Sequence, residues 1–250
     1  MQAVSIKLSS LSIQEETMRR DTVIFDLDNT LVNRKKAYEK FSHAFIDRFV
    51  ACTDSSTRYD IVEQMRIADN NGYRKKQELY EELFDRLEKQ NSATTADDMI
   101  QFWFSDFYKY TELMDNALSV LQYLQSNNYK IALITNGSSR SQHSKIDSVQ
   151  LRPFFDEIIV SDDVGCKKPH RSIFDLTLAR LEATPDQCWY IGDHPINDIK
   201  GANEVGIHTI WLQGFMEQYK NSGVASYTIN DLNEIIPIIN KYNRGDSVEN

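Results

Sequence analysis

The stretch that decides the fold runs from Thr22 to Leu31 and reads Thr-Val-Ile-Phe-Asp-Leu-Asp-Asn-Thr-Leu. Its apolar run, Val23 to Phe25, does not alternate with polar residues, which is typical of a strand covered on both faces inside a parallel sheet. Two carboxylates, Asp26 and Asp28, end this strand, at the edge where open α/β sheets bind ligands. A capping Asp followed by a solvated one does not explain why both end a buried strand. Because two like charges so close repel each other, the pair predicts a divalent metal.

Length and charge limit the classes of protein. The chain of 250 residues is long enough to bury a full core, as one large domain or one domain with an insertion. Its hydrophobic share of 41% is ordinary for a globular protein. A net charge of −9 argues against a nucleic-acid polymer as partner, because binding through phosphates needs a basic surface. A small phosphorylated ligand needs only a local cation and stays possible.

The ends of the chain and its cysteines predict a cytoplasmic location. Residues 1–20 contain no apolar block of the length that a signal peptide or membrane span requires, so we expect an N-terminal extension and no membrane partner. The polar residues 243–250 are expected to form a frayed tail. Cys52, Cys166 and Cys188 have neither zinc-type spacing nor an even count, which is typical of reduced thiols.

Residues 33–113 show helical periodicity and no strand-like alternation. Large apolar residues recur there at spacings of three and four: Tyr38, Phe41, Phe45, Phe49, Leu79, Leu83 and Leu87. The turn signal Asn70-Asn71-Gly72 separates two of the expected helices. We interpret this stretch as an α-helical insertion, hinged near Val32 and Met114, whose aromatic residues form a bundle core rather than a platform for a substrate.

After the insertion, strands and helices alternate along the chain. The pattern predicts strands at residues 130–135, 157–161, 188–192 and 207–212, with a short edge strand at 227–229. It predicts helices at residues 117–124, 173–181 and 198–205, and a last one from about residue 232. Residues 21–32 and 114–242 therefore form one α/β domain with a parallel sheet.

Four polar clusters end these strands or lie in the loops after them. They are Asp26 with Asp28, Thr135, Lys168 before Pro169, and Asp193 with Asp198. Taken alone, Thr135 could cap a turn, Lys168 could be a solvated cation and Asp193 could begin the next helix. Brought together at one sheet edge, a hydroxyl can bind a phosphoryl oxygen, an ammonium can neutralise its charge, and the carboxylates can ligate Mg²⁺. This set predicts phosphoryl transfer.

With these residues the chain resembles the haloacid dehalogenase superfamily from residue 21 to about residue 240. The stretches that match the four signatures of that family are Asp26-Leu27-Asp28-Asn29-Thr30-Leu31, Ile134-Thr135-Asn136-Gly137, Lys168-Pro169, and Gly192-Asp193 through Asp198. The resemblance implies a Rossmann-like, doubly wound parallel sheet. It also implies that residues 33–113 are a helical cap, which closes over the site and contacts the substrate.

The resemblance implies a mechanism in two steps. Asp26 would attack phosphorus and form an aspartyl-phosphate, which water then hydrolyses. Asp28 would protonate the leaving oxygen and later activate the water. Thr135 and Lys168 would hold the transferring group.

The resemblance also implies a Mg²⁺ cofactor. Its ligands would be the Asp26 side chain, the Asp28 backbone carbonyl and Asp193. Asp198 would be either a direct ligand or a partner of metal-bound water.

Five residues are candidates for contacts with the substrate. Asn136 and Gly137 would offer backbone donors. Asn33 and Arg34, just after the nucleophile loop, and Arg74, after the turn of the insertion, are placed to meet distal groups of a substrate. The alternative for these last three is solvated surface.

Asp28 favours phosphate chemistry over dehalogenation, because a dehalogenase forms its alkyl ester without protonating an alkoxide. A phosphonatase would need a Schiff-base lysine in the cap, but the lysines there look like solvated charges: Lys35, Lys36, Lys75 and Lys76. The sequence therefore predicts a Mg²⁺-dependent phosphomonoesterase for a small phosphorylated metabolite, a nucleoside monophosphate or a sugar phosphate, acting as a monomer or homodimer. A sugar-phosphate mutase and a catalytically idle phosphate-binding module are the alternatives.

Overall fold

The computed structural model describes residues 21–52, 54–216 and 225–243. The extension expected at residues 1–20 lies outside this range, as does all but the first residue of the tail expected at 243–250. Within the described ranges, no helix combines the length and the apolar character that crossing a membrane requires.

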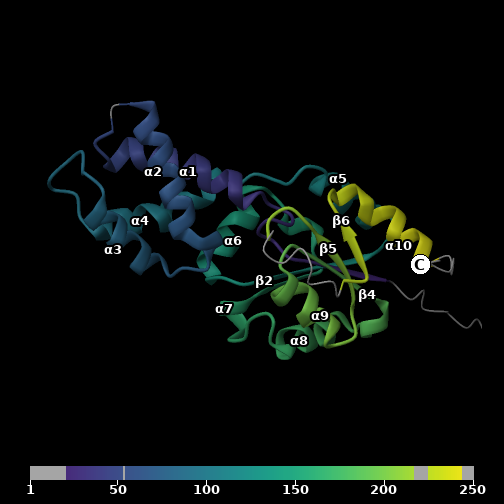
Figure 1. The fold of residues 1–250 in the computed structure, drawn as a ribbon. Coiled ribbons are helices and arrows are strands. Elements are labelled where there is room, and N and C mark those ends of the chain that lie inside the picture. The colour runs from purple at the N-terminus through teal and green to yellow at the C-terminus, as the bar shows by residue number, and fades with distance from the viewer. Residues whose placement is uncertain (1–20, 53, 217–224, 244–250) are drawn as a thin grey trace, which may run out of the picture.

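A six-stranded parallel sheet forms the centre of the larger domain, in the order β3-β2-β1-β4-β5-β6 (Figure 1). The strands are β1 Thr22–Phe25, β2 Lys130–Thr135, β3 Glu157–Val160, β4 Cys188–Gly192, β5 His208–Leu212 and β6 Tyr227–Ile229. β1 pairs with β2 on one side and with β4 on the other. The carboxylates that follow β1 therefore lie in the middle of the sheet edge, between the ends of β2 and β4.

Helices cover both faces of the sheet, as the unbroken apolar run of β1 predicts. Val23 and Phe25 pack into one cluster with α5 (Ala117–Ser126) and α10 (Ile235–Asn243), whereas Ile24 packs into a second cluster with α8 (Arg171–Leu181). Figure 1 shows α5 and α10 on one side of the strands and α8 on the other. This arrangement confirms the predicted doubly wound α/β fold.

The residues between β1 and α5 form a helical unit beyond one end of the sheet (Figure 1). It contains α1 (Arg34–Phe49), α2 (Ser55–Asp69), α3 (Lys76–Arg86) and α4 (Ala96–Asp106), with 3-10 turns at Asn70–Gly72 and Phe107–Tyr110. These helices share a hydrophobic cluster of their own, which contains the aromatic residues of the periodic pattern. The two links to the sheet domain run antiparallel side by side, because Val32 bridges Leu113.

Three helical segments of the sheet domain differ from the prediction. The short helix α7 (Ser161–Val164) was not predicted, and it begins at the last residue of the strand predicted at 157–161. Helix α6 (Ser139–Ser148) was not predicted, because its sequence is polar and Ile146 is its one buried apolar residue. The helix predicted at 198–205 instead begins as a π-helical turn, Pro195–Lys200, followed by the short α9 (Gly201–Asn203). The side chain of His194 caps this turn by accepting from Ile196 N and Asn197 N.

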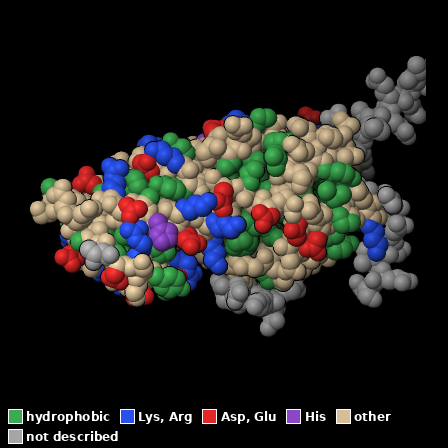
Figure 2. Space-filling model, turned by 90° about the horizontal axis from the view of Figure 1, so that it is seen from above, with side chains coloured by type: hydrophobic (Ala, Val, Ile, Leu, Met, Phe, Trp, Pro, Cys, Tyr) green, Lys and Arg blue, Asp and Glu red, His purple; other side chains and the backbone are tan. Residues whose placement is uncertain are grey.

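Charged side chains of both signs are distributed over the surface. On the face in Figure 2, the Lys and Arg side chains of the described residues are interspersed with Asp and Glu. This distribution agrees with the net charge of −9 and offers no continuous basic stripe on that face to a nucleic-acid polymer.

Candidate active site

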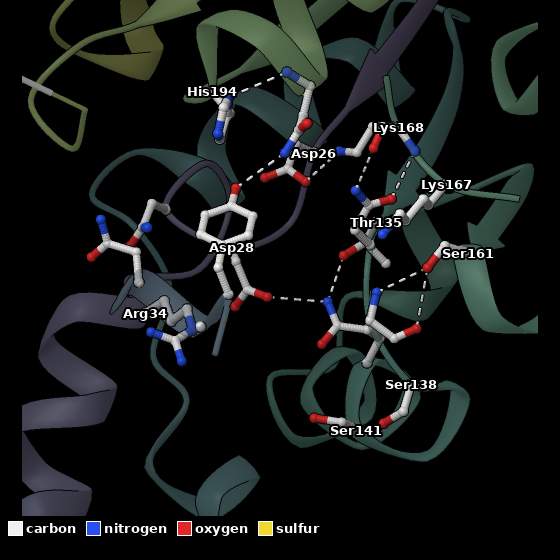
Figure 3. Close-up of a pocket in the computed structure, with 18 of the residues that line it drawn as sticks. Asp26, Asp28, Arg34, Thr135, Ser138, Ser141, Ser161, Lys167, Lys168 and His194 are labelled. Atoms are coloured by element: carbon white, nitrogen blue, oxygen red, sulfur yellow. Dashed lines mark hydrogen bonds and ion pairs between the residues drawn. The ribbon is translucent and has the colours of Figure 1, made fainter. Parts of the chain in front are cut away.

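The loop after β1 turns both leading carboxylates toward one pocket. Asn29 takes up the left-handed conformation (φ 61°), which its short polar side chain tolerates better than most residues. The backbone N of Val32 then donates to Leu27 O at 3.0 Å and closes the loop. Asp26 and Asp28 lie on the walls of the resulting pocket (Figure 3).

The pocket is a cavity of about 900 Å³ between the helical unit and the sheet edge. Nearly all site residues expected from the sequence line it: Asp26, Asp28, Arg34, Arg74, Thr135, Asn136, Gly137, Lys168, Asp193 and Asp198. Asn33 does not; its side chain caps α1 by accepting from Lys36 N at 3.0 Å. Asn33 therefore caps α1 outside the pocket lining, and its contact with a substrate stays a prediction.

Lys168 is the cation at the bottom of the site and is only 3% exposed. Its Nζ lies 2.6 Å from Asp26 Oδ1 and 2.7 Å from Asp198 Oδ1, and donates to Ile134 O at 2.8 Å and Tyr190 Oη at 2.9 Å. This burial excludes the alternative of a solvated loop cation. The ammonium is held rigidly beside one oxygen of Asp26, where a transferring phosphoryl group would need positive charge.

Asn136 and Gly137, which follow β2, form hydrogen bonds with the neighbouring loops. The Asn136 side chain donates to Lys168 O and accepts from Lys168 N, both at 2.9 Å, so it fixes the segment that carries the lysine. Gly137 N donates to Ser161 Oγ at 3.0 Å. A Cβ on Gly137 would lie 2.8 Å from the Gln142 side chain, and its φ of +151° is unfavourable for other residues. Both residues hold the loops around the pocket in place.

Three buried carboxylates could hold a metal ion. Asp26, Asp193 and Asp198 each offer an oxygen, and these atoms lie within 4.8 Å of one another. Burial raises the pKa of Asp26 to about 7 although Lys168 opposes it, and burial next to Asp26 and Asp198 raises the pKa of Asp193 well above its usual range. Asp193 Oδ2 is buried without a hydrogen-bond partner among the described residues. An all-oxygen site with a surplus of negative charge and an unsatisfied oxygen fits Mg²⁺.

Asp198 differs from Asp193 because both of its oxygens are already engaged. Oδ1 contacts Lys168 Nζ at 2.7 Å, and Oδ2 accepts from His194 N at 2.9 Å. The carboxylate packs so closely on Gly192 that a Cβ there would lie 2.5 Å from Asp198 Cγ. Glycine at position 192 is therefore required for this approach, and Asp198 holds Lys168 in place.

Two polar residues of α6 in the site were not predicted from the sequence. Lys145, 4% exposed, places Nζ 2.8 and 2.7 Å from the two carboxylate oxygens of Asp28. Gln142 Nε2 donates to Asp28 Oδ2 at 3.1 Å and to Thr135 Oγ1 (Figure 3). Burial would raise the pKa of Asp28, but Lys145 and Arg34 hold it below its usual value. The sequence signal is the spacing of three between Gln142 and Lys145, which is weak without an apolar pattern.

The helical unit also reaches the opposite side of the site. Asn197 Nδ2 donates to Tyr73 Oη at 3.2 Å, and the ring of Tyr73 stands edge-on to the ring of His194, with 5.5 Å between the centroids. Tyr73 follows the turn between α2 and α3. The helical unit and the sheet domain therefore enclose the pocket from two sides.

Known proteins resemble this chain in sequence and in fold. The family of haloacid dehalogenase-like hydrolases matches residues 23–212. The chain is 30% identical over 241 residues to a glyceraldehyde 3-phosphate phosphatase of Pyrococcus furiosus, covering 92% of this chain and 97% of that protein. It is 28% identical over 222 residues to the Methanocaldococcus jannaschii protein of the same name, covering 87% and 96%. The solved structure of the putative HAD-hydrolase YfnB from Bacillus subtilis, bound to magnesium, has a TM-score of 0.68 at 24% identity, covering 89% of this chain and 99% of that one. The chain therefore belongs to the haloacid dehalogenase-like hydrolase family.

Proposed function

We propose that the protein is a Mg²⁺-dependent phosphomonoesterase that hydrolyses a small phosphorylated metabolite through an aspartyl-phosphate. The observation that carries this proposal is the position of Asp26, which lies in the pocket wall with one oxygen 2.6 Å from the Lys168 ammonium. Asp28 lines the same pocket two residues later. The names of the relatives, phosphatases for glyceraldehyde 3-phosphate, support phosphate ester chemistry.

In the first step, Asp26 attacks phosphorus and the alcohol leaves. Thr30 Oγ1 donates to Asp26 Oδ2 at 3.2 Å, which orients the carboxylate. Lys168 neutralises charge on the transferring group, and the Thr135 hydroxyl hydrogen-bonds one of its oxygens. In the second step, a water attacks the phosphorus of the aspartyl-phosphate and restores Asp26.

Asp26, Asp193 and the backbone carbonyl of Asp28 would hold Mg²⁺, with Asp198 as a direct ligand or as a partner of bound water. When bound, the ion supplies positive charge that stabilises the transition state and offsets the repulsion among the carboxylates. The unsatisfied oxygen of Asp193 supports this assignment.

The metal proposal predicts loss of activity with a chelator. Purified protein is expected to release phosphate from p-nitrophenyl phosphate, to lose that activity in excess EDTA and to regain it when Mg²⁺ is added. Full activity in EDTA would overturn the metal assignment. An isomeric sugar phosphate formed without net phosphate release would favour the mutase. Phosphate binding without any turnover would favour the idle module.

Asp28 is proposed as the general acid for the leaving oxygen and the general base for the attacking water. Asp28→Asn is expected to lower kcat/KM for alkyl phosphates by roughly 10²- to 10⁴-fold, the usual contribution of a positioned acid or base. The loss is expected to be much smaller for p-nitrophenyl phosphate, because nitrophenolate leaves without a proton. Steady-state kinetics on both esters checks this difference. The same loss on both would contradict the role of Asp28 as acid.

The class of metabolite, a nucleoside monophosphate or a sugar phosphate, is part of the proposal. A colorimetric screen of phosphate release across a panel of phosphorylated metabolites tests it directly. The cytoplasmic location and the monomeric or dimeric state stay predictions.

A further inference from the structure

Three largely buried cations line the side of the pocket next to Asp28. They are Arg34 of α1, Lys76 of α3 and Lys145 of α6, which we call the basic subsite. Arg34 is 7% exposed and Lys145 is 4% exposed. The side chain of Lys76 is 13% exposed, so the sequence-based expectation that it is a solvated charge was wrong. The subsite joins the helical unit to the sheet domain.

An aromatic surface underlies the basic subsite. Arg34 Cζ lies 5.6 Å and Lys145 Nζ 5.5 Å from the centroid of the same ring, that of Phe107. Lys76 Nζ lies 4.8 Å from the ring of Trp103, which stacks on Phe107 with 3.9 Å between the centroids. Cations over ring faces gain cation–π attraction. Of these two rings of the bundle core, that of Trp103 also lines the pocket.

The charges of the subsite do not balance. Asp69 contacts Arg34 at 2.8 Å and Lys76 at 2.6 Å, and Asp28 contacts Lys145 at 2.7 Å. Three cations therefore face two carboxylates. A buried excess charge is costly unless a partner neutralises it.

One nitrogen of the subsite has no partner. Arg34 Nη1 contacts Asp69, but Arg34 Nη2 is buried without a hydrogen-bond partner in the described part of the chain. The ion pair with Asp69 links α1 to α2 and gives Nη1 a partner, but it gives Nη2 none among the described residues. Gly72, at φ +92°, packs against the guanidinium so closely that a Cβ would lie 2.9 Å from Nη2. Arg34 is therefore held from behind while it lines the cavity (Figure 3).

We propose that the basic subsite binds an anionic group on the leaving alcohol, so that the preferred substrates are phosphate monoesters carrying a carboxylate or a second phosphate close to the ester oxygen. The inference rests on the proposed function, because Asp28 marks the position of the leaving oxygen. The guanidinium of Arg34, which lines the pocket, donates to the anionic group, and Lys145 and Lys76 supply charge. Burial lowers the pKa of Lys76 to about 8, although the Asp69 carboxylate opposes this, and the nearby Arg34 lowers it further.

Esters matched in length test the subsite. We expect the parent to hydrolyse 2-phosphoglycolate with a kcat/KM at least about tenfold above that for 2-hydroxyethyl phosphate, which replaces the carboxylate by an alcohol. The bisphosphate of ethylene glycol distinguishes a second phosphate from a carboxylate. Arg34→Gln is expected to reduce the preference for the charged esters by about tenfold, as for loss of one charge-assisted hydrogen bond.

Two further variants separate recognition from folding. Asp69→Asn removes the partner of Arg34 and is expected to keep or raise the preference for the charged esters. The double variant Arg34→Gln, Asp69→Asn removes both charges of the Arg34–Asp69 pair and takes away the carboxylate that Lys76 contacts. It is expected to lose the preference, because the Arg34 donor is absent. Arg66→Gln, an exposed arginine of α2 paired with Glu63, serves as the matched control and is expected to keep it. Melting curves establish that each variant folds.

Binding to the Asp26→Asn protein, measured by calorimetry, tests the subsite without turnover. Tighter binding of 2-phosphoglycolate than of 2-hydroxyethyl phosphate, lost in the added Arg34→Gln background, supports the proposal. Equal binding of the two esters, or an unchanged preference in the folded double variant, would overturn it. If both esters release phosphate at equal rates, the protein is a phosphatase but the basic subsite does not recognise the anionic group. If the protein binds the charged ester selectively but releases phosphate from no ester, the subsite is supported and the phosphatase activity is contradicted.

Discussion

Asp26→Asn is expected to fold like the parent and to lose at least about 10⁴-fold in kcat on every phosphate ester. The amide is a poor nucleophile, and the neighbouring carboxylates have other roles. Asp198 is engaged by Lys168 and His194 N, and Asp28 by Lys145. Asp193, the third member of the acidic cluster, is a proposed metal ligand. The loss is therefore expected with activated and ordinary esters alike. This distinguishes the variant from Asp28→Asn, whose effect depends on the leaving group.

The fold of the Asp26→Asn protein is expected to survive because the buried carboxylate is itself costly. Burial raises its pKa from 3.8 to about 7, so the folded metal-free parent binds this proton more tightly than the unfolded chain does. The contribution of Asp26 to the free energy of unfolding is then largest below pH 4 and is lost as the pH rises through about 7. A neutral amide removes this pH dependence.

Two measurements check the Asp26 prediction. Phosphate release gives kcat, and urea unfolding in EDTA at pH 5 and pH 8 gives the stability of both proteins. The matched control is Asp175→Asn, which changes an exposed carboxylate of α8 paired with Arg171 and is expected to leave both quantities unchanged. If the Asp26→Asn protein keeps more than about 1% of the parental kcat, Asp26 is not the nucleophile.

The sheet and the core of the site could be predicted because their signals are local. The strands at residues 130–135 and 188–192 have the predicted bounds, since runs such as Ile131 to Ile134 are apolar without interruption. Parallel strands end at one edge, so polar residues after them converge whatever the detailed packing. This is why Asp26, Thr135 and Lys168 could be brought together from the sequence.

The basic side of the pocket could not be predicted because its partners are distant in the sequence. Lys145 is buried since Asp28, 117 residues earlier, accepts its charge. Lys76 lies in a run of charged residues and reads as solvated, but Asp69 and the ring of Trp103 bury it. The buried face of α6 carries polar side chains that contact Asp28, so the helix has no apolar periodicity. Apolar periodicity is the signal from which helices were predicted, and α6 was therefore missed.

Lys168→Met is expected to be the most destabilising single change in the site. The ammonium contacts Asp26, Asp198, Ile134 O and Tyr190 Oη, so its loss leaves two buried carboxylates without their cation. Removing one partner of a buried ion pair costs about 3 to 5 kcal/mol, a large part of the 5 to 15 kcal/mol that stabilises a typical domain. We also expect kcat to fall at least about 10²-fold on all esters, because the charge beside the transferring group is gone.

The pH dependence distinguishes a missing charge from a packing defect in Lys168→Met. At pH 8 the variant is expected to unfold at a lower urea concentration than the parent. Asp26 and Asp198 are then buried without the Lys168 cation, and each must either stay charged or bind a proton from a solution that offers few. The gap should narrow at pH 5, because the buried Asp26, without Lys168 to oppose the rise in its pKa, is then protonated in the folded state. Lys167→Met, which changes the exposed neighbouring lysine, is the matched control and should show neither effect. If the difference in stability between parent and variant were the same at both pH values, Lys168 would stabilise the fold through packing. The charge of Lys168 would then not be needed to stabilise the buried carboxylates of Asp26 and Asp198.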